Sequence, residues 1–170
     1  LEEAIEQNNL VVGNMYWPRN MLIVFADEYE SETRNALRML FDSNKNVAKR
    51  INETQKVFDH LIQKRNERLG EEANSFIGLR FLSLLLGFRY PDKYNAIKPR
   101  EWHMYCRYID DEYKNQQGVA SGEKYLLLEP YIEALRNKIK KISEIQKIKE
   151  QLTRGLEFID SEFRWMAQDV

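Results

Sequence analysis

The sequence predicts an all-α fold, an irregular bundle of about six helices. Apolar residues recur every three or four positions along almost the whole chain, as they do on the buried side of a helix. The 170 residues include only 7 Gly and 4 Pro, too few for the many turns of an all-β protein. No segment alternates apolar and polar residues over the length of a strand, and only 94–97 has an extended character.

Breakers and capping residues divide the first half into helices. Trp17-Pro18 marks a start, the polar residues at 42–44 can cap a following helix, and Gly70 ends that helix. A strongly apolar helix comes next, and we expect it at the centre of the bundle. The expected spans are 1–12, 17–42 with a break near Ser31, 44–70 and 72–87.

The segment from Phe81 to Ile109 is the most informative. Its apolar run stops at Gly87, Pro91 and Asp92 mark a turn, and Pro99 suits the first position of a new helix. We name residues 88–98, which contain this turn, the elbow. The next helix is expected over 99–114, with one face formed by Trp102, Tyr105, Cys106 and Ile109.

The last third of the sequence predicts a loop followed by two long helices. Residues 115–122 are the clearest loop, and helices are expected from about 129 to 142 and from 148 to 166. The periodicity there approaches a coiled coil but lacks sustained heptads. We predict one helical domain over 1–170, with a 1–114 core and a 123–170 helical hairpin packed on it as the open alternative.

The composition of the chain restricts its cellular location and the kinds of partner it can bind. The only cysteine, Cys106, excludes an internal disulfide, and no apolar run approaches the roughly 20 residues that span a bilayer. The sequence starts without a signal-peptide pattern, so we expect a cytoplasmic protein without membrane contact, complete or cut from a longer chain. The net charge of -1 argues against nucleic-acid binding by the whole surface, but basic residues concentrate in 45–68 and 136–154. Solvated helix faces are the simpler interpretation of both zones.

The usual catalytic patterns are missing from the sequence. It contains neither the Gly-x-x-x-x-Gly-Lys-Ser/Thr loop nor the Gly-x-Gly-x-x-Gly fingerprint that bind nucleotides. One Cys and two distant His do not supply a zinc site. Cys106 and His103 share a helix face, yet a lone pair at this spacing is more typical of packing. We expect no enzyme and no cofactor; the rival is a small enzyme with a pocket around Cys106, His103 or Asp110.

Basic and aromatic residues alternate through the elbow and the helix after it. Cations bind phosphate and exposed rings stack on bases, so the pattern suggests a nucleic-acid site. The alternative is that the rings fill the core while the basic stems cover them. The candidate nucleic-acid-binding residues are Arg89, Lys93, Tyr94, Lys98, Arg100 and Trp102.

Three segments resemble a known family in the same order along the chain. In chain order, they are Val-Ala-Lys-Arg-Ile at 47–51 followed by Phe58, Arg-Tyr-Pro-Asp-Lys-Tyr at 89–94 followed by Lys98, and the Trp-containing segment 159–165. In these the chain is similar to the helical region before the motor domain of McrB-like proteins, AAA-class restriction motors driven by GTP or ATP in defence against foreign DNA.

The resemblance implies a non-catalytic N-terminal recognition or docking module. Its expected partners are DNA, the motor domain of the same full-length chain and the nuclease subunit. The motor's nucleotide-binding loop is absent from this sequence, so no catalytic residue carries over. The alternative is a helical protein-interaction or spacer domain with no nucleic-acid role.

Overall fold

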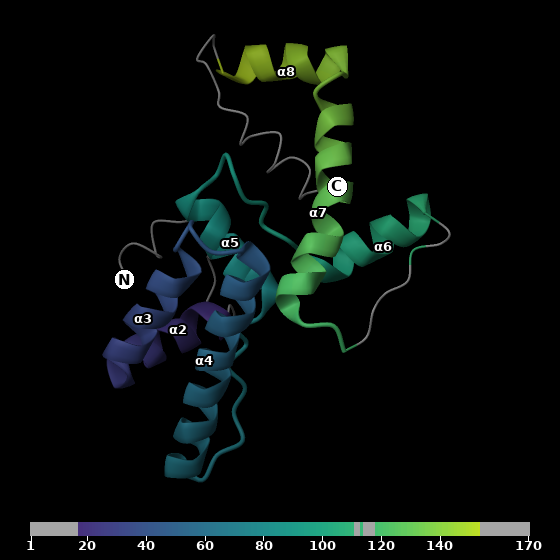
Figure 1. Ribbon diagram of the computed structural model, residues 1–170. Helices are drawn as coiled ribbons and strands as arrows, with labels where there is room; N and C mark the ends of the chain where they lie inside the picture. Colours follow the sequence, from purple (N-terminus) through teal and green to yellow (C-terminus); the bar gives the residue numbers. More distant parts are fainter. Residues whose placement is uncertain (1–16, 111–112, 114–117, 154–170) are drawn as a thin grey trace. The chain divides into compact units, whose positions relative to one another are not determined.

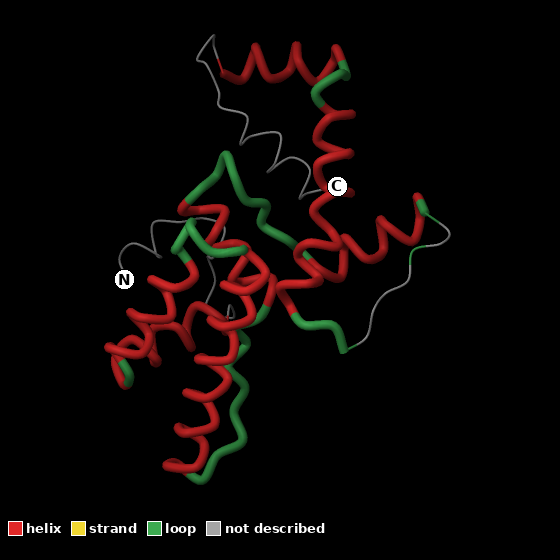
Figure 2. Tube along the Cα trace, viewed as in Figure 1, coloured by secondary structure: helices red, strands yellow, loops and turns green. Residues whose placement is uncertain are grey.

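A computed structural model describes residues 17–110, 113 and 118–153, and in these ranges the protein is all-α with no strand (Figures 1 and 2). This confirms the predicted fold class. The helix expected over 1–12 and most of the one expected over 148–166 lie outside the described residues. The described helices are α2 (Trp17–Glu28), α3 (Glu30–Leu40), α4 (Val47–Leu69), α5 (Leu79–Arg89), α6 (Pro99–Ile109), α7 (Ser121–Ile139) and α8 (Ser143–Thr153).

The chain forms two compact units, Leu1–Leu82 and Ser83–Val170. The boundary falls inside α5, so one continuous helix contributes its first turn to the first unit and its remainder to the second. Five apolar side chains of α5 are buried; they are Leu79, Phe81, Leu82, Leu84 and Leu86.

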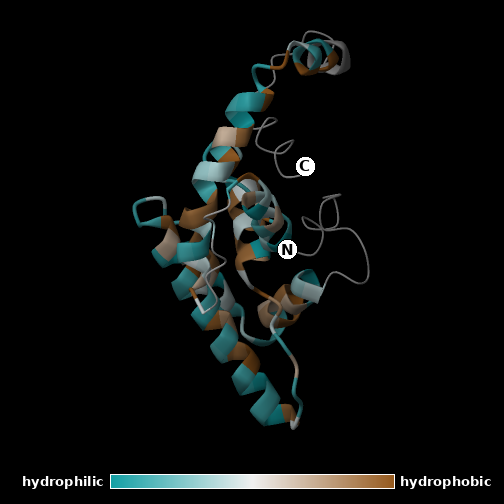
Figure 3. Cartoon of the chain, turned by 90° about the vertical axis from the view of Figure 1, so that its right-hand side faces the viewer, coloured by the Kyte–Doolittle hydropathy of each residue, from teal (hydrophilic) through white to brown (hydrophobic). Residues whose placement is uncertain are grey.

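The first unit is built on α2, α3 and α4. Its core is a set of fully buried apolar side chains, in which the rings of Phe25 and Phe58 lie 5.5 Å apart between centroids. The teal and brown bands along α4 show that apolar residues keep to one side of this long helix (Figure 3). Further core residues of these helices are Leu22, Ala36, Leu40, Ala48, Ile51, Leu61 and Ile62.

Buried polar side chains tie these helices together. Thr33 Oγ1 donates to the carbonyl of Phe25 at 2.8 Å, and Thr54 Oγ1 donates to that of Ala36 at 3.3 Å. Both hydroxyls are thereby satisfied away from water, where an unpaired polar group would be costly.

The ends of the first helices follow local capping chemistry. The break expected near Ser31 falls at Tyr29, and α4 starts after Asn46, whose Oδ1 accepts from the amides of Ala48 (2.9 Å) and Lys49 (3.2 Å). The predicted cap at 42–44 was therefore two residues too early. Gly70 ends α4 as predicted, with a φ of 67° that a side chain would disfavour.

The helix expected over 72–87 begins only at Leu79, and 71–77 returns along α4 without helical structure (Figure 2). Asn66 on α4 binds the backbone of Ala73 twice, by its Nδ2 to the carbonyl at 2.8 Å and by its Oδ1 from the amide at 3.2 Å. Asn74 Oδ1 also accepts from the amide of Phe76, which has a φ of 56°. These side chains satisfy backbone groups that a helix would otherwise pair internally. At its other end α5 continues through Gly87 to Arg89.

In the second unit the elbow is held by hydrogen bonds to its backbone. The amide of Ile97 donates to Ser83 Oγ at 2.9 Å, and the amide of Asn95 donates to the hydroxyl of Tyr125 at 3.1 Å. The side chain of Asn95 also donates to Glu133 at 3.3 Å. The segment at 94–97 is thus pinned to α5 and α7 as a non-helical link rather than a strand.

The helices after the elbow differ from expectation mainly at their ends. Pro99 occupies the start of α6 as predicted, and α6 ends at Ile109, five residues earlier than expected. The helix expected from about 129 begins at Ser121, so Pro130 lies inside α7.

Candidate functional site

The structure separates the six predicted nucleic-acid-binding residues into two groups. Arg89, Lys93 and Arg100 are exposed, and Lys98 is half-buried. Tyr94 and Trp102, in contrast, belong to the core, with 7% and 4% of their surfaces exposed. Their ring faces are therefore not open to a nucleic-acid base in this structure.

The exposed cations of the elbow cover neighbouring rings. The Arg89 guanidinium lies 5.4 Å from the ring centroid of Tyr90, and the Lys93 ammonium lies 5.4 Å from that of Tyr94. The charged heads thus lie over ring faces of their own segment, and the ring of Tyr94 is buried, an arrangement closer to the core-covering alternative than to an open stacking site.

A different surface stands out on α6, on the side opposite its buried residues. Trp102 and Cys106 turn inward, whereas Met104 is 65% exposed and Tyr108 is 87% exposed. The exposed charged side chains of Arg100, Glu101 and Arg107 surround Met104 and Tyr108. Within the described part of the chain, none of these five side chains forms a hydrogen bond or an ion pair. We name Arg100, Glu101, Met104, Arg107 and Tyr108 the outer face of α6.

The inner side of α6 is anchored by an aromatic and polar cluster. His103 Nδ1 is hydrogen-bonded to the hydroxyl of Tyr113, and Tyr131 on α7 donates to Asp110 at 2.8 Å. The rings of Tyr113 and Tyr131 meet edge to face, 5.7 Å apart between centroids. This inner cluster fixes the orientation of α6, and therefore of its outer face.

The thiol of Cys106 and two groups of the inner cluster, the phenol of Tyr113 and the imidazole of His103, are shifted toward their neutral forms. Burial, with a smaller contribution from Asp110, raises the pKa of Cys106 to about 11. Burial also raises the pKa of Tyr113 to about 12, and burial together with nearby Lys124 lowers the pKa of His103. A reactive cysteine needs the opposite shift, toward the thiolate. The geometry around Cys106, His103 and Asp110 therefore supports packing rather than nucleophilic chemistry.

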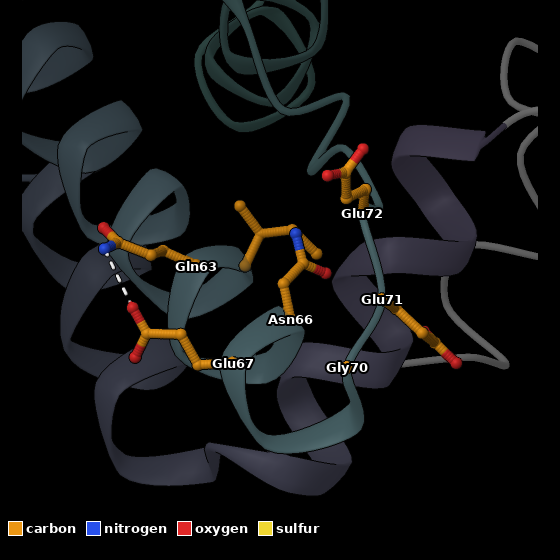
Figure 4. A pocket seen from close by; sticks show the side chains of 7 residues that line it. Gln63, Asn66, Glu67, Gly70, Glu71 and Glu72 are labelled. Carbon is orange, nitrogen blue, oxygen red and sulfur yellow. Dashed lines mark hydrogen bonds between the residues drawn. The ribbon is translucent and has the colours of Figure 1, made fainter.

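The first unit contains a groove of about 510 Å³ between the end of α4 and the returning segment (Figure 4). Its polar groups are largely engaged: Gln63 donates to Glu67 at 3.0 Å, and Glu71, which points away from the groove, pairs with Arg65 at 3.0 Å. Nowhere in the described ranges do His, Cys, Asp and Glu side chains gather into a set that could hold a metal ion. The groove is lined by Ile62, Gln63, Asn66, Glu67, Gly70, Glu71 and Glu72.

Sequence reasoning missed the exposed half of α6. The predicted apolar face grouped Ile109 with Trp102 and Cys106, yet Ile109 is 47% exposed. Met104 was not singled out, although helical spacing places it opposite Trp102 and Cys106. The sequence contains a signal for this surface. Met104 and Tyr108 lie four positions apart and therefore share one side of the helix, whereas Trp102 and Cys106 lie on the opposite side.

The chain matches no protein-family profile, no curated protein and no solved structure. Among the described residues, no helix combines the length and the apolar character needed to cross a membrane.

Proposed function

We propose that this chain is a non-catalytic docking module and that the outer face of α6 binds a partner protein. The observation that carries the proposal is the exposure of Met104 and Tyr108 beside Arg100 and Arg107 on a helix whose opposite side is fixed in the core. Met, Tyr and Arg are the residue types enriched in the centres of protein interfaces.

The energetics favour association through this face. Burying an exposed Met or aromatic side chain contributes about 1.5–3 kcal/mol each, and the face needs no reordering because the inner cluster already holds α6 in place. Its two arginines can form hydrogen bonds with planar acceptors on a partner. If the resemblance to McrB-like proteins holds, the motor domain of the full-length chain and its nuclease subunit are the partners to consider first.

Site-specific photo-crosslinking tests the proposal. A photoreactive amino acid is placed at Met104 in the full-length protein, and a matched variant carries it at Ile148, an apolar residue on α8 that is 53% exposed. We expect a discrete protein adduct from position 104 and none from position 148. If both positions give the same products, or neither gives any, the outer face of α6 is not a docking surface.

A second candidate function is phosphate contact by the elbow and the first turn of α6, favoured by the exposure of Arg89, Lys93 and Arg100 within twelve residues of the chain. Because Tyr94 and Trp102 are buried, such binding would use charge without base stacking, and affinity should fall steeply with salt. Single- and double-stranded DNA titrations across a salt series measure this. Lys93→Glu with Arg100→Glu should abolish binding, while Arg38→Glu with Lys56→Glu, the same change in net charge at two exposed positions of the first unit, should not. No binding at low salt would exclude this function.

A further inference from the structure

We infer that the outer face of α6 binds a second copy of this chain, with the two α6 helices parallel and related by a twofold axis that runs beside them. The inference rests on the proposed docking function and names its partner. It is carried by the arrangement of charges on the face, which is complementary to itself in this orientation.

The positions on the helix follow from its geometry. A helix turns by about 100° and rises by about 1.5 Å per residue. With Met104 at the centre, Arg100 and Arg107 fall on one flank, and Glu101 and Tyr108 fall on the other. Arg100 and Glu101 are therefore almost level along the axis, and so are Arg107 and Tyr108.

A twofold axis parallel to α6 brings opposite flanks of the two copies together at the same height. Arg100 of one copy then faces Glu101 of the second copy, which forms an ion pair, and the reciprocal pair forms by symmetry. Arg107 likewise faces Tyr108 of the second copy, an arrangement that suits a cation–π contact. Met104 meets its own counterpart on the axis and supplies the apolar centre.

The antiparallel arrangement is disfavoured by the same charges. Its twofold axis is perpendicular to the helices and brings like flanks together, so Arg100 and Arg107 of one copy would face those of the other. Like charges opposed across an interface cost free energy and suppress that pairing. The charge pattern thus selects the parallel orientation.

The contact is small, and the association should be weak. α6 has only 11 residues, and one face of so short a helix buries less than the roughly 1,200–2,000 Å² of a stable interface. We therefore expect a dimer that forms at high protein concentration and dissociates on dilution.

Charge reversal in the purified chain tests the pairing without altering the core. Sedimentation equilibrium up to about 1 mM compares the wild type with Arg100→Glu, Glu101→Arg and the double variant. Each single variant should weaken dimerisation about tenfold, because two symmetry-related pairs become repulsive, and the double variant should recover to within about twofold of the wild type. A wild type that is monomeric throughout, or a double variant no better than the singles, overturns the inference.

Disulfide trapping tests the geometry independently. Met104→Cys in a Cys106→Ala background places a thiol beside the axis, so mild oxidation should link two copies. Ile148→Cys in the same background is the matched control and should stay monomeric. Failure of the residue 104 thiols to link, or equal linking at 148, overturns the parallel arrangement; the charge variants still decide the matter if Cys106→Ala impairs folding.

The photo-crosslinking experiment separates this inference from the proposed function. An adduct of Met104 with a different polypeptide, together with a monomeric purified chain, overturns the self-association and leaves the docking function standing. An adduct of two copies of this chain supports both. If position 104 gives no adduct, both the docking function and the self-association are overturned.

Discussion

At the scale of single residues, buried polar side chains stabilise the first unit by satisfying backbone carbonyls. Arg50 is fully buried on α4, and its Nη1 donates to the carbonyl of Leu40 at 2.9 Å. That carbonyl belongs to the last residue of α3, where the helix has carbonyls without partners and the negative end of its dipole. The Arg50 side chain on α4 therefore caps the C-terminal end of α3.

Cys106 gives a prediction on pH. Its thiol ionises near pH 8.5 in an unfolded chain, whereas burial raises its pKa to about 11 in the folded protein. The folded state thus favours the neutral thiol, and this contribution to stability is complete below about pH 8.5 and is lost as the pH rises toward 11.

Urea unfolding at pH 7, 9 and 10.5 measures the effect as the difference between wild type and Cys106→Ala. The advantage of the wild type should shrink over this range, and a thiol reagent should react with the native protein far more slowly than with the unfolded chain. If the two proteins keep the same difference at every pH, the thiol is not buried as the structure shows.

At the scale of secondary structure, α4 is defined by its two ends. Asn46 accepts two amide hydrogen bonds at the start, and Gly70 provides the left-handed residue after the end. Between them, 23 residues form the longest described helix, and the returning segment is held against it by Asn66.

Asn46→Ala should lower the free energy of unfolding by about 1 kcal/mol, because the amides of Ala48 and Lys49 lose their acceptor. Asn44→Ala is the control, since Asn44 is exposed and only its backbone amide is bonded, to Asp42 at 3.2 Å. Chemical denaturation of both variants measures the two changes. Equal losses would mean that the helix is capped elsewhere in 42–46.

On the largest scale, the boundary between the two units lies within the residues of α5. This helix carries fully buried leucines on both sides of the boundary, Leu82 in the first unit and Leu86 in the second. Because its hydrogen bonds continue across the boundary, we expect α5 to unfold as one piece.

Leu86→Ala should lower stability by about 2–5 kcal/mol, as expected when a buried leucine leaves a cavity. Hydrogen exchange should accelerate over the entire Leu79–Arg89 helix, including its turn in the first unit. Leu85→Ala, at a half-buried neighbour, should have a smaller effect. Acceleration confined to residues after Leu82 would show that α5 behaves as two separate halves.

Sequence patterns alone predict the fold class, the start of α6 at Pro99 and the end of α4 at Gly70. These follow from local chemistry: apolar spacing, the missing amide of proline and the tolerance of glycine for positive φ. The absence of nucleotide-binding loops in this chain could likewise be read from residue types alone.

Which residues of the elbow and α6 face the solvent depends on tertiary packing and does not follow from their order in the sequence. Basic and aromatic residues alternate there, and the pattern is compatible with a stacking site or with a covered core. Packing buried Tyr94 and Trp102 and left Met104 and Tyr108 exposed. Contacts distant in sequence also kept 71–77 out of α5, because Asn66 on α4 pairs with the backbone of Ala73. Burial depends on which elements meet, and apolar periodicity along one helix does not specify its neighbours.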